Sequence, residues 1–212
     1  MNLAVDVISD VICPWCYIGK RRLEKAIAAL GGQPNVRVQW HAFQLNPSMP
    51  KEGINRKEYR TRKFGSWERS LALDSKVIEV GKTEGIQFAF DLIERTPNTV
   101  DAHRLIWLAE QHNCQDAVVE ALFRAYFTEG LDIGNRQILI DLASGAGIER
   151  QVVEFLLNGE EGMDAFQEAG ELSRQHRVDS VPFFIIDKQI TLSGAQEPEA
   201  FIDAIKQAIG SQ

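Results

Sequence analysis

The chain has 212 residues, of which 44% are hydrophobic and 25% are charged, and its formal net charge is −7 at pH 7. These values are ordinary for a globular protein, and the length suits one large domain or a domain with a sizeable insertion. The negative charge argues against nucleic acid as a general partner, and no apolar run approaches the ~20 residues that cross a membrane.

The N-terminal segment predicts a strand over residues 3–8 and a helix over 14–30, joined by the sequence Cys13-Pro-Trp-Cys16. Pro14 suits the first turn of a helix, where its missing N–H leaves no hydrogen bond unmade. The two cysteines are therefore expected where a strand ends and a helix begins.

This position favours thiol chemistry. A helix N-terminus carries unpaired N–H groups and a partial positive charge, which stabilise a thiolate at Cys13. Cys16 follows three residues later, on the same face of the helix and within disulfide reach. One sulfur would attack a partner and the other would resolve the mixed disulfide.

Two structural interpretations of the cysteine pair compete with redox chemistry. A zinc site needs four ligands, usually from a second pair, but the only other cysteine is Cys114, and the four histidines form no paired motif (His41, His103, His112 and His176). A structural disulfide across so short a loop would constrain the unfolded chain little. Three cysteines do not make a disulfide scaffold.

No secretory signal is visible in the sequence, so we expect a cytoplasmic protein. In that reducing compartment the cysteine pair is expected to alternate between dithiol and disulfide.

The next segment alternates apolar and polar residues over 36–43, which predicts a half-exposed edge strand. No convincing strand is visible over 55–177. Ser66 and Asn135 are expected to cap helices, and Asn98, with Asp101 three residues later, resembles a capping box. Helices are expected over 66–81, 99–112, 116–129, 136–144, 149–157 and 161–176.

The C-terminal segment predicts a hairpin of two strands, 181–186 and 190–192, followed by a helix over 199–209. The order βαβ, a long helical block and then ββα predicts an α/β protein with a thioredoxin fold. We expect residues 1–50 and 178–212 to form this core. Residues 51–177 are too long for a loop, so we expect them to form an inserted helical domain.

Motifs along nearly the whole chain resemble the FrnE-like branch of the DsbA family. They are Asp10-Val-Ile-Cys-Pro-Trp-Cys-Tyr-Ile-Gly19, Leu45-Asn-Pro47, Pro97-Asn-Thr99 with Ala102-His-Arg-Leu105, Ala125-Tyr-Phe127, Val181-Pro-Phe-Phe184 and Ser193-Gly-Ala-Gln196. The resemblance implies a thiol–disulfide oxidoreductase with a helical insertion. One departure is the dipeptide between the cysteines, which is Pro-Trp and not the Pro-His of DsbA.

The same plan is similar to that of 2-hydroxychromene-2-carboxylate isomerases and kappa-class glutathione transferases. Their active position is typically a single serine that activates glutathione, whereas this chain has a cysteine pair, which favours disulfide exchange. The resemblance leaves glutathione as a possible co-substrate and implies no metal or other cofactor.

Several other residues are expected around the pair, and the resemblance assigns one of them. Pro182 matches the cis-proline that faces the cysteines in thioredoxin folds, and the backbone of Val181 would pair with an extended substrate. Trp15 is expected to be partly exposed beside Cys13. Asn98 and Thr99, at the start of a helix with His103, are candidates to overhang the cysteines, although Asn98 could equally be a plain N-cap.

The sequence therefore predicts an oxidoreductase that exchanges disulfides with protein or small-molecule thiols. Two other functions stay open: a glutathione-dependent isomerase or transferase, and a holdase chaperone that binds unfolded chains in the insert. Cys114 is expected to be an idle or buried thiol.

Overall fold

Four strands form the central sheet. The computed structural model describes residues 2–210, in which β1 (Asn2–Ser9) lies between β2 (Asn35–Ala42) and β5 (Phe183–Ile186), with β6 (Ile190–Ser193) beside β5. β2 is parallel to β1, whereas β5 and β6 are antiparallel to their neighbours. Strands from both ends of the chain thus share one sheet, and the predicted thioredoxin fold with a helical insertion is confirmed.

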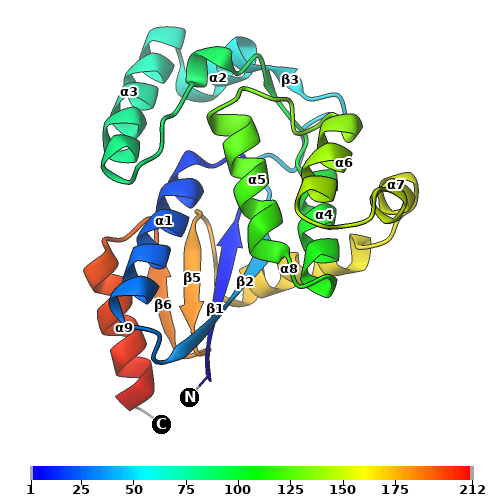
Figure 1. Ribbon diagram of the computed structural model, residues 1–212. Coiled ribbons are helices and arrows are strands. Elements are labelled where there is room, and N and C mark those ends of the chain that lie inside the picture. Colours follow the sequence, from blue (N-terminus) through cyan, green and yellow to red (C-terminus); the bar gives the residue numbers. More distant parts are fainter. Residues whose placement is uncertain (1, 211–212) are drawn as a thin grey trace.

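Two helices of the core pack beside each other on the sheet. α1 (Pro14–Ala29) and α9 (Pro198–Gly210) lie side by side, and α9 contacts β5 and β6 (Figure 1). α1 begins after β1 and runs back along the sheet, so its N-terminus lies at the end of the sheet where β1 ends (Figure 1). This arrangement places the cysteine pair at one end of the sheet.

Helices of the insertion cover the other strands. α4 (Val100–Gln111), α5 (Gln115–Phe127) and α8 (Met163–Gln175) contact the edge strand β2. Val7 and Ile8 of β1 are both fully buried. Because successive side chains of a strand point to opposite faces, both faces of the sheet are covered at this point.

Other elements of the insertion arch over the end of the sheet where α1 begins (Figure 1). They are β3 (Ile54–Asn55), α2 (Arg56–Phe64), α3 (Trp67–Thr83), the 3-10 helix η1 (Phe90–Leu92) and β4 (Arg95–Thr96). The remaining helices, α6 (Arg136–Gly145) and α7 (Arg150–Asn158), pack against α4 on the side away from α1 (Figure 1). Among residues 2–210, no helix combines the length and the apolar character needed to cross a bilayer.

The structure corrects three local predictions in this region. The segment 55–177 does contain strand, because β3 pairs with β4 over two residues. The sequence analysis also missed α2, which begins after Asn55, whose side chain accepts a hydrogen bond from the Glu58 N–H. The capping box is wrong: Thr99 is the N-cap residue of α4, and its side chain makes no capping hydrogen bond.

Other helix boundaries follow the sequence closely. Ser66 caps α3 by accepting from the Arg69 N–H, and Asn135 caps α6 by accepting from the N–H groups of Gln137 and Ile138, as predicted. These residue types are favoured at such positions because their side chains satisfy N–H groups that lack an intrahelical partner.

Buried contacts hold the insertion against α1. The Tyr17 ring stacks on Phe123 of α5 with a centroid distance of 5.0 Å. Lys20, which is almost fully buried, places its Nζ 3.1 Å from Asp116 Oδ2 and 3.2 Å from Glu120 Oε2, both also on α5. The helix that carries the cysteines is thus fixed directly to the insertion.

Candidate active site

Cys13 is the N-cap residue of α1, and Cys16 lies in its first turn. The Cys16 N–H donates to the Cys13 carbonyl at 3.0 Å, and the Cys13 N–H donates to the Asp10 carbonyl at 3.0 Å. No acidic residue occupies the first turn of α1, so no carboxylate within the helix itself offsets the partial positive charge of this end. Both cysteines are free thiols.

The two thiols have different environments. Cys13 lines a cavity with 5% of its surface exposed, whereas Cys16 is completely buried behind it. Burial raises the pKa of Cys16 well above its ordinary value, and the neighbouring Cys13 raises it further. Cys16 is therefore held as a protonated thiol at neutral pH.

The loop before β5 lies against Cys13. Cys13 Sγ is 3.4 Å from the Val181 carbonyl oxygen, to which it donates, and the Val181–Pro182 peptide bond is cis. The Gly194 N–H donates to the Pro182 carbonyl at 2.8 Å. Gly19 of α1 permits the close approach, because a Cβ there would lie 3.0 Å from the Pro182 ring.

A buried carboxylate supports the turn between β1 and α1. Asp10 is fully buried; its Oδ2 accepts from the Leu45 N–H at 2.8 Å, and its Oδ1 lies 3.3 Å from His103 Nε2. His103 Nε2 is also 3.1 Å from the Phe43 carbonyl oxygen. The sequence analysis assigned no role to Asp10, although it stands three residues before Cys13 in the motif that carries the family resemblance.

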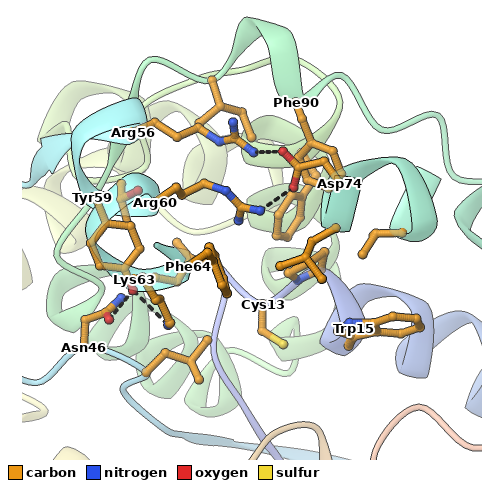
Figure 2. Close-up of a pocket in the computed structure, with 18 of the residues that line it drawn as sticks. Cys13, Trp15, Asn46, Arg56, Tyr59, Arg60, Lys63, Phe64, Asp74 and Phe90 are labelled. Atoms are coloured by element: carbon orange, nitrogen blue, oxygen red, sulfur yellow. Dashed lines mark hydrogen bonds and ion pairs between the residues drawn. The ribbon is translucent and has the colours of Figure 1, made fainter. Parts of the chain in front are cut away.

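A cavity of about 390 Å³ opens beside Cys13. Trp15, which is 39% exposed, lies at its edge, as expected. Figure 2 shows that much of the opposite wall comes from α2 and α3, with Arg56 and Arg60 directed toward Asp74. Sequence reasoning missed this wall. Its only visible signal was the run of basic residues that follows Asn55.

Two of the predicted site residues lie elsewhere. Asn98 and Thr99 are not among the described residues that line the cavity. The Asn98 amide donates to the Met49 carbonyl at 2.7 Å and accepts from the Val100 N–H at 3.0 Å, and Thr99 is buried at the start of α4. The Asn98 side chain is therefore held by the backbone on both sides.

The remaining candidates are also outside the cavity. Cys114 is the N-cap residue of α5, partly buried, and burial raises its pKa. His41 pairs with Asp6 across β1 and β2, with 2.8 Å between Nε2 and Oδ1. Among residues 2–210, no group of three or more His, Cys, Asp or Glu side chains is arranged to hold a metal ion.

The fold is that of DsbA-like thiol–disulfide oxidoreductases. The chain belongs to the family of the DSBA-like thioredoxin domain, whose model matches residues 4–206. A probable DsbA oxidoreductase from Streptomyces coelicolor superposes with a TM-score of 0.92 and 31% identity, covering 99% of this chain and 91% of that one.

More distant structures share the fold. A 2-hydroxychromene-2-carboxylate isomerase has a TM-score of 0.71 at 15% identity, covering 98% of this chain and 95% of that one. The cytosolic disulfide reductase DsbM from Pseudomonas aeruginosa, solved with GSH, has a TM-score of 0.70 at 17% identity, covering 98% and 99%. The predicted likeness to the DsbA family and to 2-hydroxychromene-2-carboxylate isomerases is therefore confirmed at the level of the fold.

Proposed function

We propose that the protein is a thiol–disulfide oxidoreductase that exchanges disulfides through Cys13 and Cys16. The observation that carries this proposal is the asymmetry of the pair. One sulfur stands at a helix N-terminus beside a cavity, and the other is buried directly behind it with a raised pKa. Such a pair has one group that meets the partner and one that stays protected until the partner is bound.

The reaction needs only the two sulfurs. The Cys13 thiolate attacks a substrate disulfide, forms a mixed disulfide and releases one substrate thiolate. Cys16 then gives up its proton and attacks Cys13, which closes the Cys13–Cys16 bond and releases the second thiolate. The pair loses two electrons and the substrate gains two. In the opposite direction, a substrate thiolate attacks the Cys13–Cys16 bond and is itself oxidised.

Other groups position the partner in this proposal. The Val181 carbonyl, 3.4 Å from Cys13 Sγ, would accept a backbone N–H from an extended substrate. Trp15 would contact the substrate at the rim. No metal or organic cofactor is required, because the electrons move between sulfur atoms.

We also propose glutathione or a comparable thiol as one exchange partner. Support comes from DsbM, a disulfide reductase that shares the fold of this chain and whose structure was solved with GSH. DsbM is described as cytosolic, and a cycling pair suits a reducing compartment. A cytoplasmic location therefore remains part of the proposal.

Trapping the mixed disulfide tests the assignment. In Cys16→Ser, oxidised glutathione or insulin should form a stable adduct on Cys13, because the group that releases the partner is missing. Mass spectrometry of the wild type should instead show an internal Cys13–Cys16 disulfide. Cys114→Ser is the matched control and should behave as the wild type does.

The same variants separate the rival functions. A glutathione-dependent isomerase or transferase should retain its activity in Cys16→Ser. A holdase should suppress aggregation of an unfolded protein even when Cys13 and Cys16 are both serine. An adduct that forms on Cys114, or no adduct on Cys13, contradicts the proposed exchange.

A further inference from the structure

The cavity beside Cys13 differs in charge from the rest of the chain. The whole sequence carries a formal charge of −7. Around the cavity, however, the charged side chains are four cations and two carboxylates: Arg56, Arg60, Lys63 and Lys76, with Asp74 and Asp179. A positively charged cavity in an acidic protein indicates a binding preference, because the local field acts on a ligand more strongly than distant charges do.

The excess charge is built into the wall by three side chains. Asp74 Oδ2 lies 2.7 Å from Arg56 Nη2, and Asp74 Oδ1 lies 2.6 Å from Arg60 Nη2. The exposed fractions are 6% for Arg56, 16% for Arg60 and 7% for Asp74. Two guanidinium groups therefore share one carboxylate in a largely buried setting, which leaves one positive charge without a counterion.

Arg60 experiences this excess directly. Burial lowers its pKa, and the Arg56 guanidinium lowers it further, against the opposing effect of Asp74. An anion that entered the cavity would relieve the unfavourable charge. The Arg60 guanidinium also lies over the aromatic ring of Phe64, with 4.8 Å between Arg60 Cζ and the ring centroid.

A second polar group faces the same space. Lys63 Nζ donates to the Tyr59 hydroxyl at 2.9 Å, and that hydroxyl donates to the Asn46 side-chain oxygen. In Figure 2 these three residues meet on one side of Phe64, with Arg60 above it and Cys13 across the cavity. The cations and the sulfur thus border one compartment.

We propose that this cavity selects small thiols and disulfides that carry a carboxylate or another anionic group, held by Arg60 and Lys63 while their sulfur meets Cys13. The proposal rests on the proposed function and specifies its substrate class. A volume of about 390 Å³ lies within the range of about 300–1,000 Å³ that is typical of small-molecule sites. The remaining lining is largely apolar, which strengthens the attraction between charges inside it.

Two chromogenic disulfides test this preference. Dithiobis(nitrobenzoate) carries a carboxylate on each ring, and dithiodipyridine is uncharged at neutral pH. In a Cys16→Ser, Cys114→Ser background, Cys13 attacks either reagent and one reagent half becomes disulfide-bonded to Cys13. The other half leaves as an absorbing product: thionitrobenzoate from the first reagent, and from the second a thiolate that takes up a proton to become thiopyridone. Stopped-flow absorbance gives the second-order rate for each reagent, and their ratio cancels changes in the reactivity of Cys13 itself.

Arg60→Gln in this background should lower the rate with the anionic reagent by about fivefold or more and leave the neutral reagent nearly unchanged. Lys63→Gln, at an exposed position that should not disturb folding, should act in the same direction. Arg60→Lys should restore part of the rate. The matched control is Arg62→Gln on the same helix, whose side chain is 70% exposed and outside the described cavity lining.

The outcomes separate this inference from the proposed function. If Arg60→Gln and Lys63→Gln leave the ratio of rates unchanged, or change it no more than Arg62→Gln does, the anionic preference is wrong although Cys13 still exchanges. If Cys13 reacts with neither reagent, the proposed function fails. A rate with the anionic reagent that does not fall as salt concentration rises also overturns the inference.

Discussion

Alanine substitutions at three helical glycines should rank by the space around each missing Cβ. At Gly170 of α8, a Cβ would meet only Arg174 Nη1, at 3.5 Å. At Gly19 of α1, a Cβ would lie 3.0 Å from the rings of Pro182 and Phe184. At Gly81 of α3, a Cβ would lie 2.4 Å from the Phe88 ring. None of the three requires a positive φ, so every alanine gains the same helix propensity.

That gain is about 1 kcal/mol in the free energy of unfolding, and steric conflict opposes it. Gly170→Ala should be stabilised by nearly the full amount. Overpacking typically costs about 1–3 kcal/mol. Gly19→Ala should incur this cost, because the two rings beside its Cβ have little freedom to move. Phe184 is fully buried with its ring centroid 4.7 Å from that of Phe201, and the Pro182 ring is fixed to the backbone. We expect Gly19→Ala to lose about 1 kcal/mol net.

Gly81→Ala should be the least stable of the three. Its Cβ would overlap Phe88, whose ring stacks on Phe90 at 4.9 Å between centroids, so the net loss should reach about 2 kcal/mol or more. Urea unfolding followed by circular dichroism, with the thiols kept reduced, gives the midpoints and slopes. If Gly19→Ala is as stable as Gly170→Ala, α1 does not pack tightly on the Pro182 loop and the reasoning is refuted.

Two further predictions follow from buried polar groups. Burial is the largest cause of the raised pKa of Cys16. The rate at which Cys16 releases a mixed disulfide from Cys13 should therefore keep rising above about pH 9, where an ordinary thiol is already largely ionised. Single-turnover rates that level off below this pH would contradict the assignment. Arg104 is buried and donates to the carbonyls of three residues in 156–161, so Arg104→Met should lower the free energy of unfolding by about 3 kcal/mol, whereas the exposed control Arg124→Met should change it by less than about 1 kcal/mol.

Local sequence patterns were sufficient for the framework of the site. Strand periodicity, the Pro14 position and the cap residues Ser66 and Asn135 act over a few residues, and the structure follows them. The order of the elements, with strands at both ends of the chain, was also enough to predict the thioredoxin fold. The resemblance directed attention to Val181–Pro182, which does lie beside Cys13.

Contacts between distant segments decided the rest. The helix α2 has no apolar stripe in its sequence, so periodicity could not reveal it, and its Arg56 and Arg60 are held by Asp74, which lies 18 and 14 residues away. Asp10 and His103 are 93 residues apart. Asn98 was predicted as a cap or a site residue, yet its side chain joins the backbone of Met49 and Val100.

The sequence by itself therefore determined the fold class and the cysteine pair at the start of a helix, because these depend on patterns between close neighbours. Only the tertiary structure decided that Cys16 is buried while Cys13 faces a cavity, and that this cavity is positive in a chain with a net charge of −7. Burial and local charge depend on which distant segments fold together, and no single segment carries that information.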